Sequence, residues 1–176
     1  KIIRKWLDEN RTIVPISVNV SRMSLESDAI IGILTNLQKK YNVPNEYIHF
    51  EITESAVMDD KTQLIQRVSK IRELGFDIAM DDFGSGYSSL NTLKDIPIDV
   101  LKLDMDFLSG NLKNRKSDNI LTSVIRMAQS LNLYTIAEGV ETEEQANYLK
   151  NIGCNIIQGF YYSKPICKQE FEHFTA

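Results

Sequence analysis

The stretch Asp77-Ile-Ala-Met-Asp-Asp-Phe-Gly-Ser-Gly86 joins a short apolar run to two consecutive aspartates and a glycine-containing segment. The run Asp77–Met80 predicts a β-strand that is buried on both faces, as in a parallel sheet. Asp81 and Asp82 follow directly and are predicted to close that strand. Carboxylates beside a buried strand are costly unless they are paired or bind a cation, so this stretch indicates both a sheet element and a candidate site.

Outward from this stretch, short apolar runs alternate with longer helical patterns. Strands are predicted over Ile13–Asn19, Tyr47–Thr53, Asp77–Met80, Val100–Leu103, Leu133–Ala137 and Asn155–Gln158. Helices are predicted over Ile2–Glu9, Ala29–Tyr41, Lys61–Leu74, Ser117–Leu131, Glu143–Asn151 and Lys168–Phe174. Gly75 and Gly153 are predicted C-terminal caps, and Thr142 is a predicted N-cap. Alternating strands and helices predict βαβ units and a parallel sheet.

Two α/β architectures are compatible with this alternation: an open doubly wound sheet and a (β/α)8 barrel. The open sheet usually binds its ligand through a glycine-rich phosphate loop at one switch point, and no such loop follows the first predicted strand. Instead, polar residues lie at or near the C-terminal end of almost every strand. In a barrel those ends meet at one rim, where barrel enzymes place their chemistry, so the pattern favours the barrel.

The polar residues at the strand ends are Asn19, Glu51, Glu54, Asp81, Asp82, Lys102, Asp104, Glu138 and Gln158. A single Asn or Asp after a strand usually caps the next helix or makes a turn. That explanation fails for Glu51, Lys102 and Glu138, which are poor caps and lie in or beside apolar runs. The repetition of polar residues at the ends of six predicted strands indicates a site.

The chemistry that suits this set is metal-dependent. Carboxylate and amide oxygens are hard ligands, suited to Mg²⁺ or Mn²⁺ rather than to zinc. Adjacent carboxylates can share two ions, and two ions stabilise the attacking and leaving oxygens of phosphodiester hydrolysis. Lys102 can orient a nucleophilic water and offset developing charge. The alternative for Lys102 is a structural salt bridge to Asp104 or another carboxylate of the rim.

Composition argues against several other classes of protein. The 176 residues make one domain or most of one, with a formal net charge of −4, which argues against a partner that is a nucleic-acid polymer. Cys154 and Cys167 have no zinc-type spacing and are expected to be reduced thiols of a cytoplasmic protein. No apolar run approaches the ~20 residues of a membrane span.

Six segments in order then resemble the motifs of one family. They are Ser17-Val-Asn-Val-Ser21, Glu51-Ile-Thr-Glu-Ser55, Asp81-Asp-Phe-Gly-Ser-Gly-Tyr-Ser-Ser-Leu90, Leu101-Lys-Leu-Asp104, Ala137-Glu-Gly-Val-Glu-Thr142 and Gln158-Gly-Phe-Tyr-Tyr-Ser-Lys-Pro165. This set is similar to the EAL-domain cyclic di-GMP phosphodiesterases. The resemblance implies that residues 1–176 form a TIM-like (β/α)8 barrel of the EAL type that lacks its N-terminal portion, with about six of eight βα units.

The resemblance also implies roles for individual residues. Asn19, Glu51 and Asp81 would bind a metal ion, Asp82 and Glu138 would serve a second ion, and Lys102 would contact the catalytic water. Glu54 would anchor the loop Asp82–Tyr87, which contains Gly84 and Gly86. Asp104, Glu141, Gln158 and Pro165 would support the substrate or the loop. The implied reaction is hydrolysis of cyclic di-GMP to linear pGpG with two Mg²⁺ or Mn²⁺ ions.

One departure from the family pattern bears on activity. The family is named for a Glu-Ala-Leu tripeptide whose glutamate is a metal ligand, and no such tripeptide occurs in this chain. We therefore expect a longer parent protein, with a sensory or GGDEF-type domain upstream, and little activity from this fragment alone. A homodimer through the region near Asp82–Tyr87 is also implied.

Three other functions share some of these features. The first is a catalytically silent EAL-type receptor that binds cyclic di-GMP and acts through a protein partner. The second is a different metal-dependent barrel enzyme. The third, a kinase magnesium motif at Asp82-Phe-Gly84, is disfavoured because no His-Arg-Asp catalytic loop precedes it.

Overall fold

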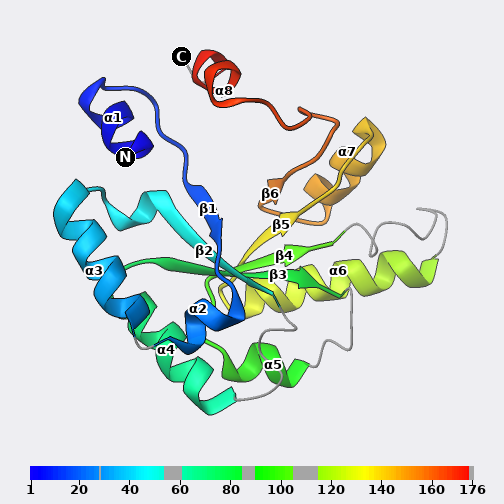
Figure 1. Cartoon of the computed structure of the whole chain (residues 1–176). Coiled ribbons are helices and arrows are strands. Elements are labelled where there is room, and N and C mark those ends of the chain that lie inside the picture. Colours follow the sequence, from blue (N-terminus) through cyan, green and yellow to red (C-terminus); the bar gives the residue numbers. More distant parts are fainter. Residues whose placement is uncertain (28, 54–60, 85–89, 105–114, 175–176) are drawn as a thin grey trace. The chain divides into compact units, whose positions relative to one another are not determined.

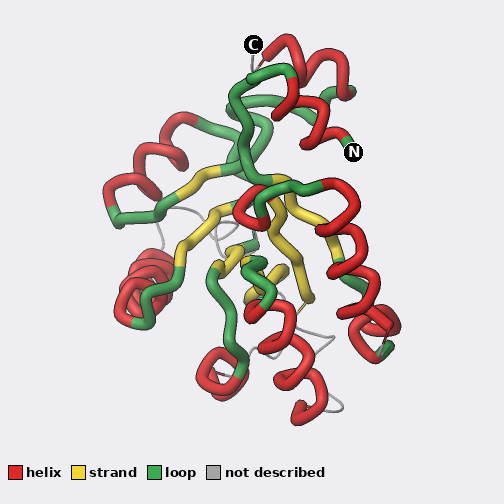
Figure 2. Tube along the Cα trace, turned by 90° about the vertical axis from the view of Figure 1, so that its left-hand side faces the viewer, coloured by secondary structure: helices red, strands yellow, loops and turns green. Residues whose placement is uncertain are grey.

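The computed structural model describes residues 1–27, 29–53, 61–84, 90–104 and 115–174, and strands and helices alternate along them (Figures 1 and 2). The strands are β1 (Ile16–Asn19), β2 (Ile48–Thr53), β3 (Asp77–Phe83), β4 (Val100–Leu103), β5 (Tyr134–Ala137) and β6 (Ile156–Ile157). The helices are α1 (Ile2–Asp8), α2 (Arg22–Glu26), α3 (Ala29–Tyr41), α4 (Lys61–Glu73), α5 (Leu90–Asp95), α6 (Arg115–Ser130), α7 (Glu143–Asn151) and α8 (Lys168–Phe174), with a 3-10 turn η1 (Asn45–Tyr47).

The sheet topology decides between the two architectures. The strand order in the sheet is the order in the sequence, from β1 to β6. The pairs β1–β2, β3–β4, β4–β5 and β5–β6 are all parallel. A doubly wound sheet reverses its strand order at a switch point, whereas a barrel adds each new strand next to the last. The order therefore confirms the incomplete TIM-like barrel and excludes the open sheet.

The chain divides into two compact units. The first unit contains Lys1–Ile52, Ala56–Ile78 and Pro165–Ala176. Its core includes Phe50 of β2, whose ring meets Phe76 edge-on at a centroid distance of 5.1 Å, with Val68 and Ile71 of α4 fully buried. Its two chain ends also meet, because the Trp6 indole of α1 donates a hydrogen bond of 2.7 Å to Glu172 of α8.

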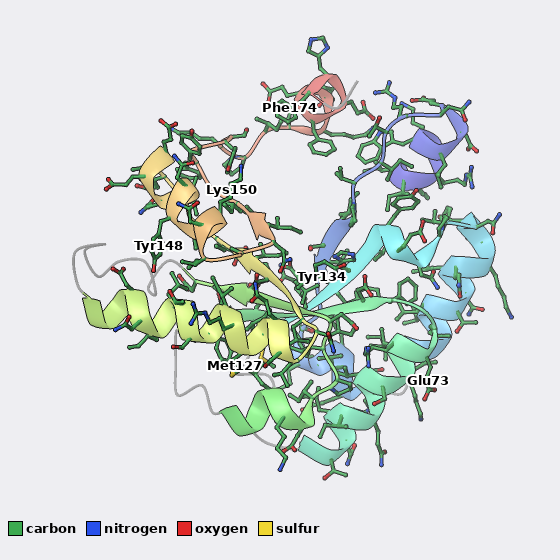
Figure 3. All side chains as sticks on the ribbon, turned by 180° about the vertical axis from the view of Figure 1, so that it is seen from behind. Glu73, Met127, Tyr134, Tyr148, Lys150 and Phe174 are labelled. Atoms are coloured by element: carbon green, nitrogen blue, oxygen red, sulfur yellow. The ribbon has the colours of Figure 1, made fainter. Side chains whose placement is uncertain are left out.

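The second unit contains Thr53–Ser55 and Ala79–Lys164. All four residues of β4 are buried. Ile125 and Ala128 of α6 and Leu149 of α7 are buried with them. The Tyr148 hydroxyl of α7 donates to the Asp118 carbonyl of α6 at 3.3 Å, and Figure 3 shows Tyr148 between these two helices. This packing holds the strands that carry most of the predicted site.

Local signals located several helix ends correctly. The predicted bounds of Ala29–Tyr41, Glu143–Asn151 and Lys168–Phe174 are confirmed. Thr142 caps α7 in a reciprocal capping box with Gln145, and Gly75 and Gly153 adopt φ angles of +91° and +90° after their helices. Such positive φ angles suit glycine, which explains both caps.

Other predictions were incomplete. The short elements α2, η1 and α5 were not predicted, because they span too few residues to show a helical period. β1 begins at Ile16 rather than Ile13, directly after Pro15, which has no N–H to donate to a sheet. β3 does not end at Met80 but continues to Phe83, and this difference affects the site. No helix in the described ranges is long and apolar enough to span a membrane.

Candidate active site at the ends of the strands

The centre of the candidate site in the second unit is Lys102 on β4. Its Nζ lies 2.8 Å from Asp81 Oδ1 and 2.9 Å from Glu138 Oε1. Lys102 is only 5% exposed, so its ammonium depends on these carboxylates for the solvation that water would otherwise supply. Partly buried carboxylates from β3 and from the residue after β5 therefore join buried Lys102 in one charged cluster.

Strand register brings these side chains together. Lys102 pairs with Ile136 across β4 and β5, and Leu103 pairs with Ala137. The ladder continues for one further residue, because the Glu138 N–H donates to the Leu103 carbonyl at 3.0 Å. Glu138 is thus held beside the C-terminal end of β4, as predicted, although β5 itself ends at Ala137.

A β-bulge positions the two aspartates. Met80 pairs with Leu101, and Phe83 pairs with Leu103. Between these pairs β3 advances by three residues and β4 by two, so β3 contains one extra residue. Asp82 adopts a φ of +56°, a left-handed conformation that Asp tolerates better than most residues, and its N–H donates to Asp81 Oδ1 at 3.1 Å. The bulge lets Phe83 enter the core, where it is 3% exposed, while Asp82 remains exposed.

The prediction that Asp81 and Asp82 follow the strand was therefore wrong in detail. They lie inside β3, and the extra residue breaks the alternation that would otherwise turn Asp82 toward the buried side. Gly84 follows with a φ of +100°, which glycine accommodates without strain. Both aspartates are available at the end of the sheet because β3 is bulged.

Electrostatics distinguish Glu138 from an ordinary surface carboxylate. Burial raises the pKa of Glu138 above its usual value, and the hydrogen bond and charge of Lys102 oppose that rise. The negative charge of Asp81 raises the pKa further. Two carboxylates share one ammonium, so an additional cation near them would favour the ionised form of Glu138.

The first unit contains a second pair of predicted site residues. Asn19 of β1 is the register partner of Glu51 on β2, and the Val20 N–H donates to the Glu51 carbonyl at 2.9 Å. Glu51 is 7% exposed, so this carboxylate is buried within β2, two residues before the strand ends. That Asn19 and Glu51 form one site with Asp81 and Glu138 stays a prediction, because the two pairs belong to different units.

The remaining predicted residues occupy more varied positions. Asp104 follows β4 directly and is partly exposed. The backbone N–H of Glu141 donates to the Gln145 side chain, so Glu141 helps to begin α7. Gln158 follows β6 and is exposed, and Pro165 is exposed in the first unit. Glu54, Gly86 and the segment 85–87 of the predicted loop lie outside the described residues.

Sequence reasoning missed Gly159. The residue before it, Gln158, accepts at its carbonyl from the Val140 N–H at 3.0 Å, and the Gln158 N–H donates to the Ala137 carbonyl at 2.8 Å. A Cβ on Gly159 would lie 2.1 Å from the Val140 carbonyl oxygen, so only glycine fits this close approach. Gly159 thereby fixes the backbone that follows Glu138. The signal was available, because a glycine after a strand can indicate a close backbone approach.

The donor chemistry fits divalent ions, but a complete ligand set is not present in one described cluster. Asp81, Asp82 and Glu138 offer hard oxygen atoms, as do Asn19 and Glu51. Within the described ranges, no three His, Cys, Asp or Glu side chains gather closely enough to form a metal site by themselves. Lys102 lies between two of the carboxylates. Metal binding therefore remains a prediction.

Comparison with known proteins identifies the family. The EAL domain model matches residues 1–165. The signaling protein YkoW of Bacillus subtilis is 37% identical over 174 residues, which cover 99% of this chain and 22% of YkoW. The cyclic di-GMP phosphodiesterase RocR of Pseudomonas aeruginosa is 33% identical, over 93% of this chain and 42% of RocR.

A solved structure agrees with these relatives. It is the PaMucR phosphodiesterase in complex with c-di-GMP, and its TM-score is 0.86 at 32% identity, over 96% of this chain and 68% of that one. The chain spans less than half the length of YkoW and of RocR, so it corresponds to a part of those proteins. The strand order, the motifs in sequence order and these matches agree, and the chain belongs to the EAL domain family.

Proposed function

We propose that this chain forms the catalytic part of an enzyme that hydrolyses one phosphodiester bond of cyclic di-GMP and releases linear pGpG. The observation that carries the proposal is the cluster in which buried Lys102 pairs with partly buried Asp81 and Glu138 at the strand ends. A relative named as a cyclic di-GMP phosphodiesterase and a similar structure titled as a c-di-GMP complex support the substrate.

The proposed mechanism assigns metal binding to the oxygen ligands. Asn19, Glu51, Asp81, Asp82 and Glu138 would hold two Mg²⁺ or Mn²⁺ ions. When bound, the ions would activate water and neutralise charge on the phosphodiester. The bulge at Asp82 serves this arrangement, because it presents consecutive carboxylates at one strand end without placing the second one in the core.

Lys102 contributes a positive charge beside the proposed metal ligands. Its side chain is almost wholly buried, so water screens that charge little when negative charge develops nearby. Its ammonium can orient the attacking water and interact more strongly with the transition state than with the substrate. Glu138, which follows β5, would also help to position that water.

Hydrolysis can be tested directly with the protein in its natural length. Cyclic di-GMP is incubated with Mg²⁺ or Mn²⁺, and the products are separated by chromatography. Asp81→Asn keeps the shape of the side chain but removes a charged ligand, and we expect kcat to fall by about 100-fold or more. Glu73→Gln, which changes an exposed carboxylate at the end of α4, is the matched control and should not change kcat. Equal turnover by wild type and Asp81→Asn would refute the proposal.

The alternative to the enzyme is a catalytically silent receptor of the same family. A receptor would bind cyclic di-GMP without converting it, which calorimetry and product analysis on the same sample would show. We expect the 176-residue chain alone to turn over more slowly than the protein in its natural length. Equal rates would show that these 176 residues supply every essential ligand.

A further inference from the structure

The position of the Lys102 ammonium has a consequence for cation binding. Its Nζ lies within 3 Å of one oxygen of Asp81 and one oxygen of Glu138. These are direct ion pairs, and the side chains are only 7%, 14% and 23% exposed for Lys102, Asp81 and Glu138. The ammonium therefore occupies the space between two converging carboxylates.

A divalent ion held by the same two oxygens would need that space. Mg²⁺ binds carboxylate oxygens at about 2.0–2.1 Å, closer than an ammonium can approach them. With all three groups ionised, the cluster has a net charge of −1. Adding a divalent ion while the ammonium stays in place would set two cations side by side in a partly buried site, where like charges repel more strongly than in water.

Lysine is suited to leave such a position. Its ammonium is a compact charge on a flexible four-carbon stem with rotatable donors, whereas arginine has a rigid planar fork. The neighbouring backbone does not need to move with it, since β4 is held by parallel pairing to both β3 and β5. The ammonium can shift while the strand remains in register.

We propose that Lys102 is an internal counter-ion that competes with a divalent cation for Asp81 and Glu138, so that cation binding requires the ammonium to withdraw from these oxygens. This inference rests on the proposed function, because it takes the two carboxylates as cation ligands. It adds a positioning role for Lys102: the residue holds both carboxylates through its ion pairs and sets the affinity of the site. If Lys102 formed a purely structural salt bridge, removing the lysine would leave cation binding unchanged or make it weaker.

The test is Mn²⁺ titration calorimetry of wild type, Lys102→Met and Lys102→Arg, with Mn²⁺ and no nucleotide. Methionine keeps an unbranched apolar stem and removes the charge. We expect Lys102→Met to bind Mn²⁺ at least tenfold more tightly than wild type. Lys102→Arg keeps the charge and should not bind more tightly. Lys150→Met, which removes an exposed lysine of α7, controls for net charge and should leave the affinity unchanged.

Thermal melting with and without Mn²⁺ provides the second readout. Without the ion, Lys102→Met should melt below wild type, because two partly buried carboxylates lose the lysine that pairs with them. Mn²⁺ should raise the melting temperature of Lys102→Met more than that of wild type. Weaker or unchanged Mn²⁺ binding by a folded Lys102→Met protein would overturn the inference and leave the proposed function standing. Mn²⁺ binding by neither protein would overturn both.

Discussion

Strands β1 and β4 both carry a predicted site residue, yet their surroundings differ strongly. In β4 every residue is buried, including Lys102. In β1, Ser17, Val18 and Asn19 are exposed and only Ile16 is partly covered. β4 lies inside the strand order with a parallel neighbour on each side, whereas β1 lies at one end of that order. The difference indicates that Lys102 is positioned by packing from all sides, while Asn19 is positioned mainly by its register with Glu51.

The largest effect should come from truncating the core beside Lys102. Leu101 is fully buried in β4, so Leu101→Ala should lower the free energy of unfolding by about 2–5 kcal/mol. Val18 of β1 is 44% exposed, and Val18→Ala should cost less than about 1 kcal/mol. Urea denaturation followed by circular dichroism measures both. Similar losses for the two variants would remove the contrast between the strands.

The next largest change in stability is expected when alanine replaces one of two glycines. Gly159→Ala would force a Cβ against the Val140 backbone, and such overpacking should cost about 1–3 kcal/mol. A Cβ on Gly32 of α3 would have no neighbouring atom within 4 Å, so Gly32→Ala should stabilise the helix by up to ~1 kcal/mol. Opposite shifts in melting temperature are expected. A stabilised Gly159→Ala protein would show that the backbone after Glu138 is not tightly held.

The bulge at Asp82 permits a finer test of the second unit. Asp82→Gly removes the carboxylate but keeps the left-handed backbone, whereas Asp82→Ala removes the carboxylate and strains it. We expect Asp82→Ala to be less stable than Asp82→Gly by about 1 kcal/mol. Both should lose the proposed cation-dependent activity to the same extent. If alanine and glycine are equally stable in thermal melts, the bulge does not depend on this φ angle.

The smallest effect concerns the contact between the chain ends of the first unit. The hydrogen bond from the Trp6 indole lowers the pKa of Glu172, and Lys168 lowers it further. The pKa of Glu172 in the folded state lies below the unfolded value of about 4.3. The stabilisation by ionised Glu172 is therefore complete above the unfolded value and is lost as the pH falls through the folded pKa. The stability difference between wild type and Glu172→Gln should therefore be largest near neutral pH and disappear in acid.

Fluorescence can follow this contact, since Trp6 is the only tryptophan in the sequence. Unfolding curves of wild type and Glu172→Gln are recorded by Trp6 emission from neutral pH down into acid. A stability difference that grows as the pH falls would have the wrong sign and would contradict the assigned direction of the pKa shift.

Residues whose structure depends on near neighbours were predictable. The capping box of Thr142 and the glycine caps at Gly75 and Gly153 act within one helical turn, so the bounds of the nearby helices could be predicted closely. The apolar run Val100–Leu103 matches β4 without correction. Glu51, Lys102 and Glu138 could be singled out from sequence, because charged groups in or beside apolar runs are costly without a partner, and their roles stay predictions.

Only the tertiary structure decided the strand register and the ion pairs between segments that are distant in the sequence. The extra residue in β3 is defined by the pairing of β3 with β4, so the local sequence Asp77–Phe83 does not predict it. Asp104 was one named partner for Lys102, with other rim carboxylates left open, and the structure shows ion pairs with Asp81 and Glu138. The sequence by itself determined the family, the alternation of elements and the residue types at the strand ends, because these depend on composition and short-range pattern. Tertiary structure alone decided which carboxylates share the lysine, because strand register brings together atoms that the chain keeps 21 and 36 residues apart.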